Sequence, residues 1–366
     1  MLMLRLLFVL LFILLFGCSK EKNDANPDQQ TTDYFPPIGE NTWEKVTPEN
    51  LEWDAAALEE LFEFLSENKT RAFVVLKNGR IVVEQYWGKN IFNSTTFDQN
   101  TLWYWASAGK TITSFLIGQA QYEDLIDINN KTSDYLGEHW TALPLDKEAL
   151  ITVKHQLTMT TGLDYGVVNP DCTEAECLQY KTDAGNQWFY HNAPYTLLDK
   201  VISTTSGISF NQFTDERLER KIGMNGNWIA SGSNNVYWST ARDAARFGLL
   251  ILNGCKWNSE PILNDPDYVE DMITSSQDIN PSYGYLWWLN GKNKIIYPGL
   301  PTAFNTSLAP GAPAVLFAAI GKNGQFIDIV PSEDLVVIRM GEAPDDALVP
   351  VTFHDELWVK MDAVIH

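Results

Sequence analysis

Cysteine and histidine are scarce in this chain of 366 residues, which has 4 cysteines and 5 histidines. None of them shows the HExxH or CxxC spacing that is typical of zinc sites, so the sequence predicts no metal site and no cofactor. Basic residues are also few, because 26 Lys and Arg stand against 47 Asp and Glu and give a formal net charge of −21. Nucleic acid is therefore excluded as a partner on charge grounds, since phosphate binding needs a basic surface.

A long apolar run occurs only at the N-terminus, over residues 6–16 after Arg5. It is too short to span a bilayer and is typical of a signal peptide, which we place at residues 1–18. Cys18 follows Gly17 and resembles the lipid-modified cysteine of bacterial lipoproteins. This resemblance predicts an exported lipoprotein, anchored to a membrane through Cys18 and facing the periplasm or the cell surface. The alternative is a plain secretory signal that happens to contain a cysteine.

The remaining sequence has the composition of a folded protein, with 45% hydrophobic and 12% aromatic residues. Residues 19–42 are polar and are expected to form a flexible tether, followed by a single domain over residues 43–366. Residues 72–76 and 81–87 are predicted strands around an Asn78-Gly79 turn, which is a strong hairpin signal. Apolar strand patterns return only after residue 284, with helical patterns between. These patterns predict an α+β fold, whose sheet combines N- and C-terminal strands around a mostly helical lobe at about residues 111–225.

Ser107 and Lys110 are the first candidates for chemistry. At positions i and i+3 of a helix the two side chains share a face, and a poorly solvated lysine can accept the proton of a serine nucleophile. The same Ser-x-x-Lys spacing also occurs at Ser19 and Ser66. Only Ser107 is flanked by aromatic and apolar residues that would bury the pair, so we favour Ser107 as the nucleophile.

Two further segments carry candidate residues. Tyr190 precedes Asn192 by two positions, and a phenol beside an ammonium can ionise below its free pKa of about 10 and act as a base. The alternative for this pair is a buried tyrosine followed by a helix-capping asparagine. Gly321 and Lys322 follow an apolar strand, where a small residue lets substrate approach and a backbone N–H can stabilise an oxyanion. An ordinary glycine-containing strand connection is the alternative there.

In this order, these segments resemble the serine β-lactamase and penicillin-binding-protein superfamily. Within it, the chain is most similar to class C β-lactamase-related hydrolases such as esterases, D-aminopeptidases and 6-aminohexanoate-dimer hydrolases. Supporting segments include ITVKHQLTMTTGL at residues 151–163, STARDAARFG at 239–248 and YGYLWW at 283–288. The resemblance covers roughly residues 50–342 and implies a β-lactamase/transpeptidase-like fold with an antiparallel sheet.

The resemblance also implies roles for individual residues. Ser107 would be the acylated nucleophile, Lys110 its partner, and Tyr190 a relay for protons. Asn192 would contact the substrate carbonyl, and the backbone N–H groups of Ser107 and Lys322 would form the oxyanion hole. The reaction would be acylation followed by hydrolysis.

One position departs from the family pattern. Ala319 stands where penicillin-recognising members carry Lys or His, and we expect the Lys322 side chain to leave the strand on another side. An apolar alanine cannot bind the carboxylate of a β-lactam, so we predict a small ester, amide or peptide substrate. The alternatives are a β-lactamase or D,D-carboxypeptidase, and a non-catalytic binding module on the same fold.

Two groups of residues have open interpretations. Cys172 and Cys177 could form a local disulfide in an exported protein, which would leave Cys255 unpaired. Several tryptophans could line an acyl pocket, although packing in the core is the simpler role; these are Trp103, Trp105, Trp188, Trp287 and Trp288.

Overall fold

The computed structural model describes residues 33–366. The predicted signal peptide, Cys18 and the tether up to residue 32 lie outside the described residues. Within the described part, no helix is both long and apolar enough to cross a membrane.

The part of the expected tether that is described lies against the domain. The backbone N–H of Tyr34 donates to the carbonyl of Asn78 at 3.1 Å, and the guanidinium of Arg246 donates to the carbonyls of Pro36 and Pro37 at 3.2 and 3.0 Å. Arg246 is only 5% exposed, and these carbonyls satisfy its buried donors. The docked chain therefore begins earlier than the expected boundary at residue 43.

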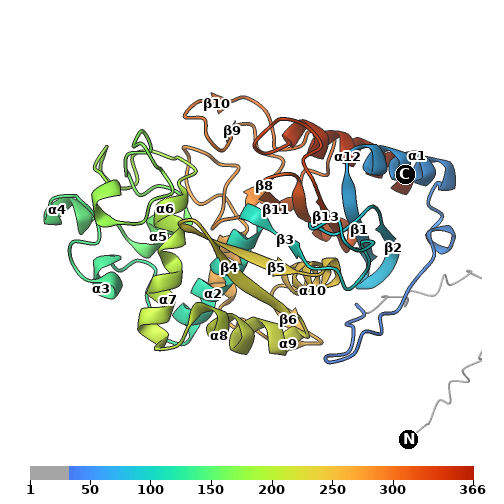
Figure 1. Ribbon diagram of the computed structural model, residues 1–366, viewed down its shortest axis with the longest axis horizontal. Coiled ribbons are helices and arrows are strands. Elements are labelled where there is room, and N and C mark those ends of the chain that lie inside the picture. The colour runs from blue at the N-terminus through green and yellow to red at the C-terminus, as the bar shows by residue number, and fades with distance from the viewer. Residues whose placement is uncertain (1–32) are drawn as a thin grey trace, which may run out of the picture. The chain divides into compact units, whose positions relative to one another are not determined.

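The core is a six-stranded antiparallel sheet in the order β2-β1-β13-β12-β11-β8, which confirms the predicted α+β fold class. The central pair, β1 and β13, thus joins the N-terminal hairpin to the C-terminal strands (Figure 1). Their bounds are β1 (Thr70–Lys77), β2 (Arg80–Tyr86), β8 (Trp288–Leu289), β11 (Phe317–Gly321), β12 (Gln325–Val330) and β13 (Leu335–Gly341).

Helices cover both faces of this sheet because adjacent residues of a strand point to opposite sides. On β12, Phe326 packs against Phe353 of α12 (Val351–Ile365), which lies beside α1 (Ala55–Glu67). The next residue, Ile327, lies near Gly248 of α10 (Ala241–Leu252) on the other face. A Cβ at Gly248 would lie 2.4 Å from Val336 Cγ1, so glycine lets α10 pack closely on the sheet.

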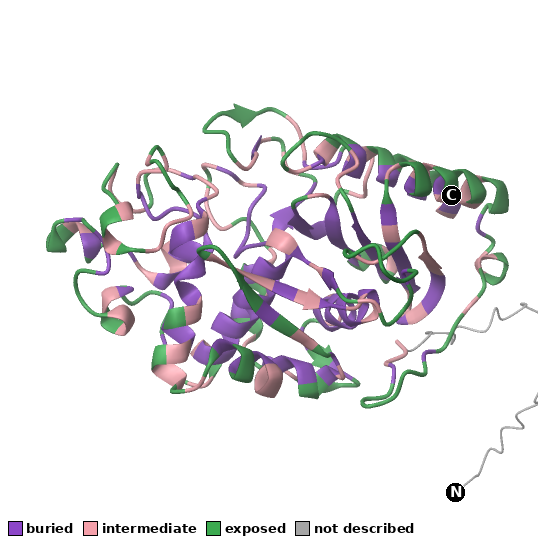
Figure 2. Ribbon diagram, in the orientation of Figure 1, coloured by how far each residue is buried: buried purple, intermediate pink, exposed green. Residues whose placement is uncertain are grey.

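The middle of the chain forms the expected mostly helical lobe. Its first helix, α2, carries Lys110 at its N-terminus and is buried along most of its length (Figure 2). The helices of this lobe are α2 (Lys110–Tyr122), α3 (Ser133–Leu136), α4 (Leu145–Glu148), α5 (Val153–Leu157), α6 (Asn192–Thr196), α7 (Leu198–Ser206), α8 (Phe210–Thr214) and α9 (Arg220–Ile222).

A small second sheet was not expected from the sequence. It has the order β3-β5-β4 and joins a hairpin after the helical lobe to the short strand before Ser107. Its strands are β3 (Trp103–Tyr104), β4 (Gly226–Ser231) and β5 (Asn234–Ser239). The remaining short elements are β6 (Lys256–Trp257), β7 (Glu260–Pro261), α11 (Pro266–Met272), β9 (Ile295–Ile296) and β10 (Ala303–Phe304).

Candidate active site

Ser107 lies in a tight turn between the second sheet and α2. The turn is a short 3-10 helix, η2 (Ala106–Gly109), and Ala106 has a φ of 48°, which is unusual for a residue with a side chain. The backbone N–H of Trp105 donates to the carbonyl of Tyr237 on β5 at 2.8 Å. The second sheet therefore holds the strained turn in place, and strain of this kind tends to occur at functional sites.

Lys110 and Ser107 are in direct contact. The Lys110 amine donates to Ser107 Oγ at 3.1 Å, as their helical spacing predicts. Lys110 is only 4% exposed, and burial lowers its pKa from the usual 10.5 to about 7, although the charge of Asp171 opposes this shift. At neutral pH a large fraction of Lys110 is therefore uncharged and able to accept a proton.

Tyr190 differs from the expectation. Burial raises its pKa well above 10, and hydrogen bonds to Ser107 and Tyr283 offset this only in part. The Lys110 amine lies over the faces of two tyrosine rings, 5.1 Å from the Tyr190 centroid and 4.1 Å from the Tyr195 centroid. The hydrogen bond of the Lys110 amine goes to Ser107 Oγ rather than to the Tyr190 hydroxyl. The prediction that Tyr190 ionises readily is therefore wrong, and its phenol remains protonated.

A cavity of about 520 Å³ opens beside the serine. Five of the residues predicted from the sequence line it together: Ser107, Lys110, Tyr190, Asn192 and Lys322. Lys322 is exposed and lies at the cavity wall.

Gly321 is not part of the cavity wall, but it lets β11 approach the serine turn. A Cβ at this position would lie 2.4 Å from the carbonyl oxygen of Trp105 and 3.1 Å from the nitrogen of Ala108. Only glycine allows this close approach. The next residue, Lys322, is thereby placed at the cavity beside Ser107.

Asn192 is oriented by a carboxylate that the sequence analysis missed. Its Nδ2 donates to Asp171 Oδ1 at 2.9 Å, while its own Oδ1 is buried and has no hydrogen-bond partner among the described residues. One of the two amide N–H groups is therefore already engaged before substrate binds. Asp171 follows no recognisable motif, and only its position next to Cys172 singled out this part of the sequence.

The other missed part of the wall comes from the unexpected hairpin. Ser231, Asn234, Asn235 and Val236, around the turn between β4 and β5, line the cavity. The Gly232-Ser233 pair between two β-prone runs was the available signal for this hairpin.

The tryptophans proposed for an acyl pocket pack in the core instead. None of the five lines the cavity, and each is at most 3% exposed. Ala319 is also fully buried, within β11, and does not reach the cavity. The wall of the site thus combines tyrosines and polar side chains with apolar residues other than tryptophan, among them Phe189, Leu348 and Val349.

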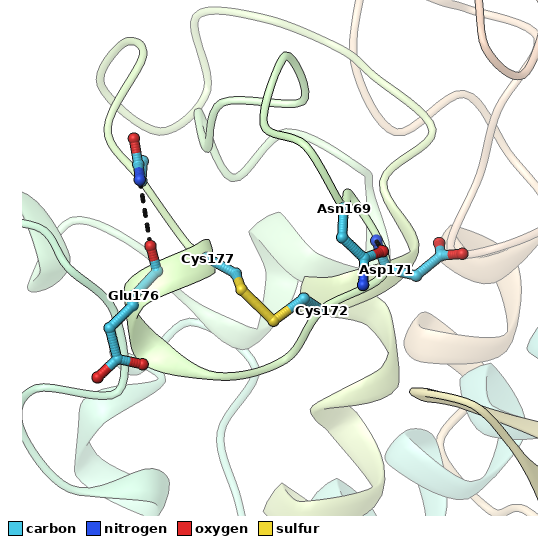
Figure 3. Close-up of a disulfide and its surroundings, with 6 residues drawn as sticks. Asn169, Asp171, Cys172, Glu176 and Cys177 are labelled. Atoms are coloured by element: carbon cyan, nitrogen blue, oxygen red, sulfur yellow. Dashed lines mark hydrogen bonds between the residues drawn. A yellow bond between two sulfur atoms is a disulfide. The ribbon is translucent and has the colours of Figure 1, made fainter.

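The candidate cysteines Cys172 and Cys177 form a disulfide (Figure 3). Cys255 is buried and forms no disulfide within residues 33–366. Within residues 33–366, no group of His, Cys, Asp and Glu side chains is arranged to hold a metal ion.

The fold and the contact between Ser107 and Lys110 agree with the family to which the chain is assigned by comparison with known proteins. The chain matches the family model described as Beta-lactamase over residues 59–347, and it belongs to this family. It is a hydrolase of the serine β-lactamase and penicillin-binding-protein family.

Individual relatives agree with this assignment. The chain is 26% identical to an uncharacterized protein of Alkalihalophilus pseudofirmus over 298 residues, 72% of this chain and 81% of the relative. It is 23% identical to a protein of Escherichia coli named Beta-lactamase over 330 residues, 76% and 84% of the two chains. Its fold is similar to that of a putative 6-aminohexanoate-dimer hydrolase from Bacillus anthracis, with a TM-score of 0.64, 21% identity, and coverage of 82% and 81%.

Proposed function

We propose that this protein is a serine hydrolase that cleaves a small ester or amide through an acyl-enzyme on Ser107. The observation that carries the proposal is the 3.1 Å contact between Ser107 Oγ and an amine of low pKa at the wall of a cavity. A serine hydroxyl is a poor nucleophile until a neighbouring base takes its proton, and Lys110 is placed to do this.

In the acylation step, the uncharged Lys110 amine accepts the Ser107 proton while Oγ attacks the substrate carbonyl. The negative charge that develops on the carbonyl oxygen is stabilised by the backbone N–H groups of Ser107 and Lys322. Ser107 lies in the first turn of η2, where backbone N–H groups have no partner within the helix. Its N–H is therefore free to bind the oxyanion.

The leaving group takes a proton as the acyl-enzyme forms. Tyr190 keeps its phenolic proton, so we assign it to donate a hydrogen bond to the leaving oxygen or nitrogen. The Lys110 ammonium gives the leaving group the proton that it took from Ser107. Water then attacks the ester carbon, and Lys110 accepts the water proton. The acid is released, Ser107 regains its hydrogen, and the enzyme returns to its starting state.

The substrate preference follows from Ala319. An apolar residue sealed in the sheet supplies no cation for a β-lactam carboxylate, which favours esters or amides over penicillins. Lys322 lines the cavity and is the one observation that favours the alternative, a β-lactamase or D,D-carboxypeptidase. The hydrogen bond between Ser107 and the buried Lys110 amine has no purpose in a non-catalytic binding module.

Labelling with a fluorophosphonate tests this proposal. We expect the intact mass of the protein to rise by one adduct, because such probes react with activated serines. Hydrolysis of p-nitrophenyl esters should then greatly exceed hydrolysis of a chromogenic cephalosporin. An unlabelled protein would contradict the hydrolase and favour the binding module, and faster turnover of the cephalosporin would favour the β-lactamase.

We further propose that the protein is exported and anchored through lipid at Cys18, on the strength of the N-terminal sequence. Several acyl chains at one cysteine give stable anchoring, since each buried CH₂ contributes about 0.8 kcal/mol. Cys18→Ser should therefore move the protein from the membrane fraction to the soluble fraction. Unchanged fractionation of this variant would show that the lipid is not the sole attachment. Cys255→Ser, at the buried cysteine, is the control and should remain with the membrane.

A further inference from the structure

Asp171 lines the cavity, and both its own backbone and the residue that follows it are fixed by local contacts. Its backbone N–H donates to Asn169 Oδ1 at 3.1 Å, and the following residue, Cys172, is joined to Cys177 five positions further on. Figure 3 shows the Asp171 carboxylate pointing away from this disulfide. The backbone of Asp171 is therefore held directly beside a covalently closed loop.

The carboxylate fixes the orientation of the Asn192 amide. A carboxylate can only accept hydrogen bonds, so the Asn192 nitrogen must face Asp171 Oδ1, at 2.9 Å. The amide oxygen is thereby turned the other way, where it is buried without a partner among the described residues. An unpaired buried acceptor is costly, so the contact with Asp171 must outweigh this cost. Asp171 thus decides which polar atoms of Asn192 are left for substrate.

Asp171 is also the only carboxylate that lines the cavity in the described part of the chain. The Lys110 amine contacts Ser107 Oγ from η2 and the ring faces of Tyr190 and of Tyr195 from α6. Two further charged residues, Asp171 and the exposed Lys322, line the same cavity. Burial raises the pKa of both phenols, so both are neutral. His191, in the same wall, is also neutral, because burial lowers its pKa to about 4. Asp171 therefore supplies the one negative charge near Lys110.

We propose that Asp171, fixed by the Cys172–Cys177 disulfide, is a positioning residue that orients Asn192 and helps set the protonation of Lys110. This inference rests on the proposed hydrolase, within which it assigns a role to a residue that no family motif marks. Opening the disulfide would free the carboxylate and change the protonation of the base. The activity of the site would then depend on an oxidising compartment, where such a disulfide persists.

The test follows the protonation of Lys110 directly, by NMR titration of the protein with labelled lysine side chains. The Lys110 signal is assigned by its absence in Lys110→Met. In Asp171→Asn the titration midpoint should fall by roughly half to one pH unit, because an attracting charge is lost while a hydrogen-bond acceptor for Asn192 remains. Glu176→Gln removes an exposed carboxylate from the same loop and should leave the midpoint unchanged. A midpoint that stays or rises in Asp171→Asn would overturn the role of Asp171.

The contribution of the disulfide is tested with the double variant Cys172→Ser, Cys177→Ser, and with mild reduction of the wild type in case the variant folds poorly. Either treatment should lower the Lys110 midpoint as Asp171→Asn does. If Lys110 titrates with the wild-type midpoint after the disulfide is removed or reduced, the proposed role of the disulfide is overturned.

The pH dependence of fluorophosphonate labelling, measured on the same proteins, separates this inference from the proposed function. The pH at which labelling reaches half its maximal rate should shift by the same amount, and in the same direction, as the NMR titration midpoint of Lys110. If the Lys110 midpoint shifts but Ser107 is never labelled, the hydrolase proposal fails, while the effect of Asp171 on Lys110 is supported.

Discussion

Replacing Ser107 with alanine should abolish hydrolysis of p-nitrophenyl esters, with a loss of about 1,000-fold or more in kcat/KM. The loss is this large because the substitution removes the atom that forms the acyl-enzyme. Thermal unfolding should change little, since Ser107 is only half-buried and alanine fits the same turn. The measurement is steady-state turnover beside a thermal melt, together with loss of the fluorophosphonate adduct.

The chain offers a matched control for this variant. Ser66 and Lys69 have the same spacing as Ser107 and Lys110, but they are exposed at the end of α1 and lie outside the cavity. Ser66→Ala should therefore keep full activity and labelling. Retained ester hydrolysis in Ser107→Ala, or loss of labelling in Ser66→Ala, would contradict the assignment of Ser107.

The three Ser-x-x-Lys segments show what the sequence could predict. The apolar residues around Ser107 correctly indicated a pair in contact, with Lys110 buried and Ser107 half-buried. At the second pair, Lys69 has a φ of 58° and lies beyond the helix, so its spacing does not produce a shared face. The Asn78-Gly79 hairpin and the C-terminal strands were also predictable, because their signals are local patterns of β-prone residues and turns.

Other features depend on contacts between distant segments and could not be predicted. The hydroxyl of Tyr190 was expected to ionise easily, but burial among Trp188, Tyr283 and Trp288 dominates over the neighbouring lysine. Asp171 lines the same cavity as Lys110 although it lies 61 positions away in the sequence, in a loop without a pattern. Desolvation and charge of this kind are properties of the packed site, so they become visible only in the structure.

The low pKa of Lys110 leads to the second large effect. If the uncharged amine is the base, the labelling rate of the wild type should rise about tenfold per pH unit below pH 7 and become constant above it. Lys110→Met keeps an unbranched side chain in the buried site but removes the base. We expect its rate at neutral pH to fall by about 10² to 10⁴-fold, the usual contribution of a general base, and the inflection near pH 7 to disappear.

Stability gives an independent measure of the same group. The folded pKa of Lys110 is lowered to about 7 and the usual value is 10.5, so between these values the unfolded chain binds more protons than the folded protein. The free energy of unfolding contributed by this group should therefore rise with pH across that window, and stay constant below pH 7. In Lys110→Met this slope should vanish. Because burying an amine that is charged in water is costly, the variant should also be at least as stable as the wild type at pH 7. If Lys110→Met unfolds more easily than the wild type and its loss of activity parallels its loss of stability, Lys110 has a structural role. If the variant is stable, inactive and without the pH inflection, Lys110 is identified as the base.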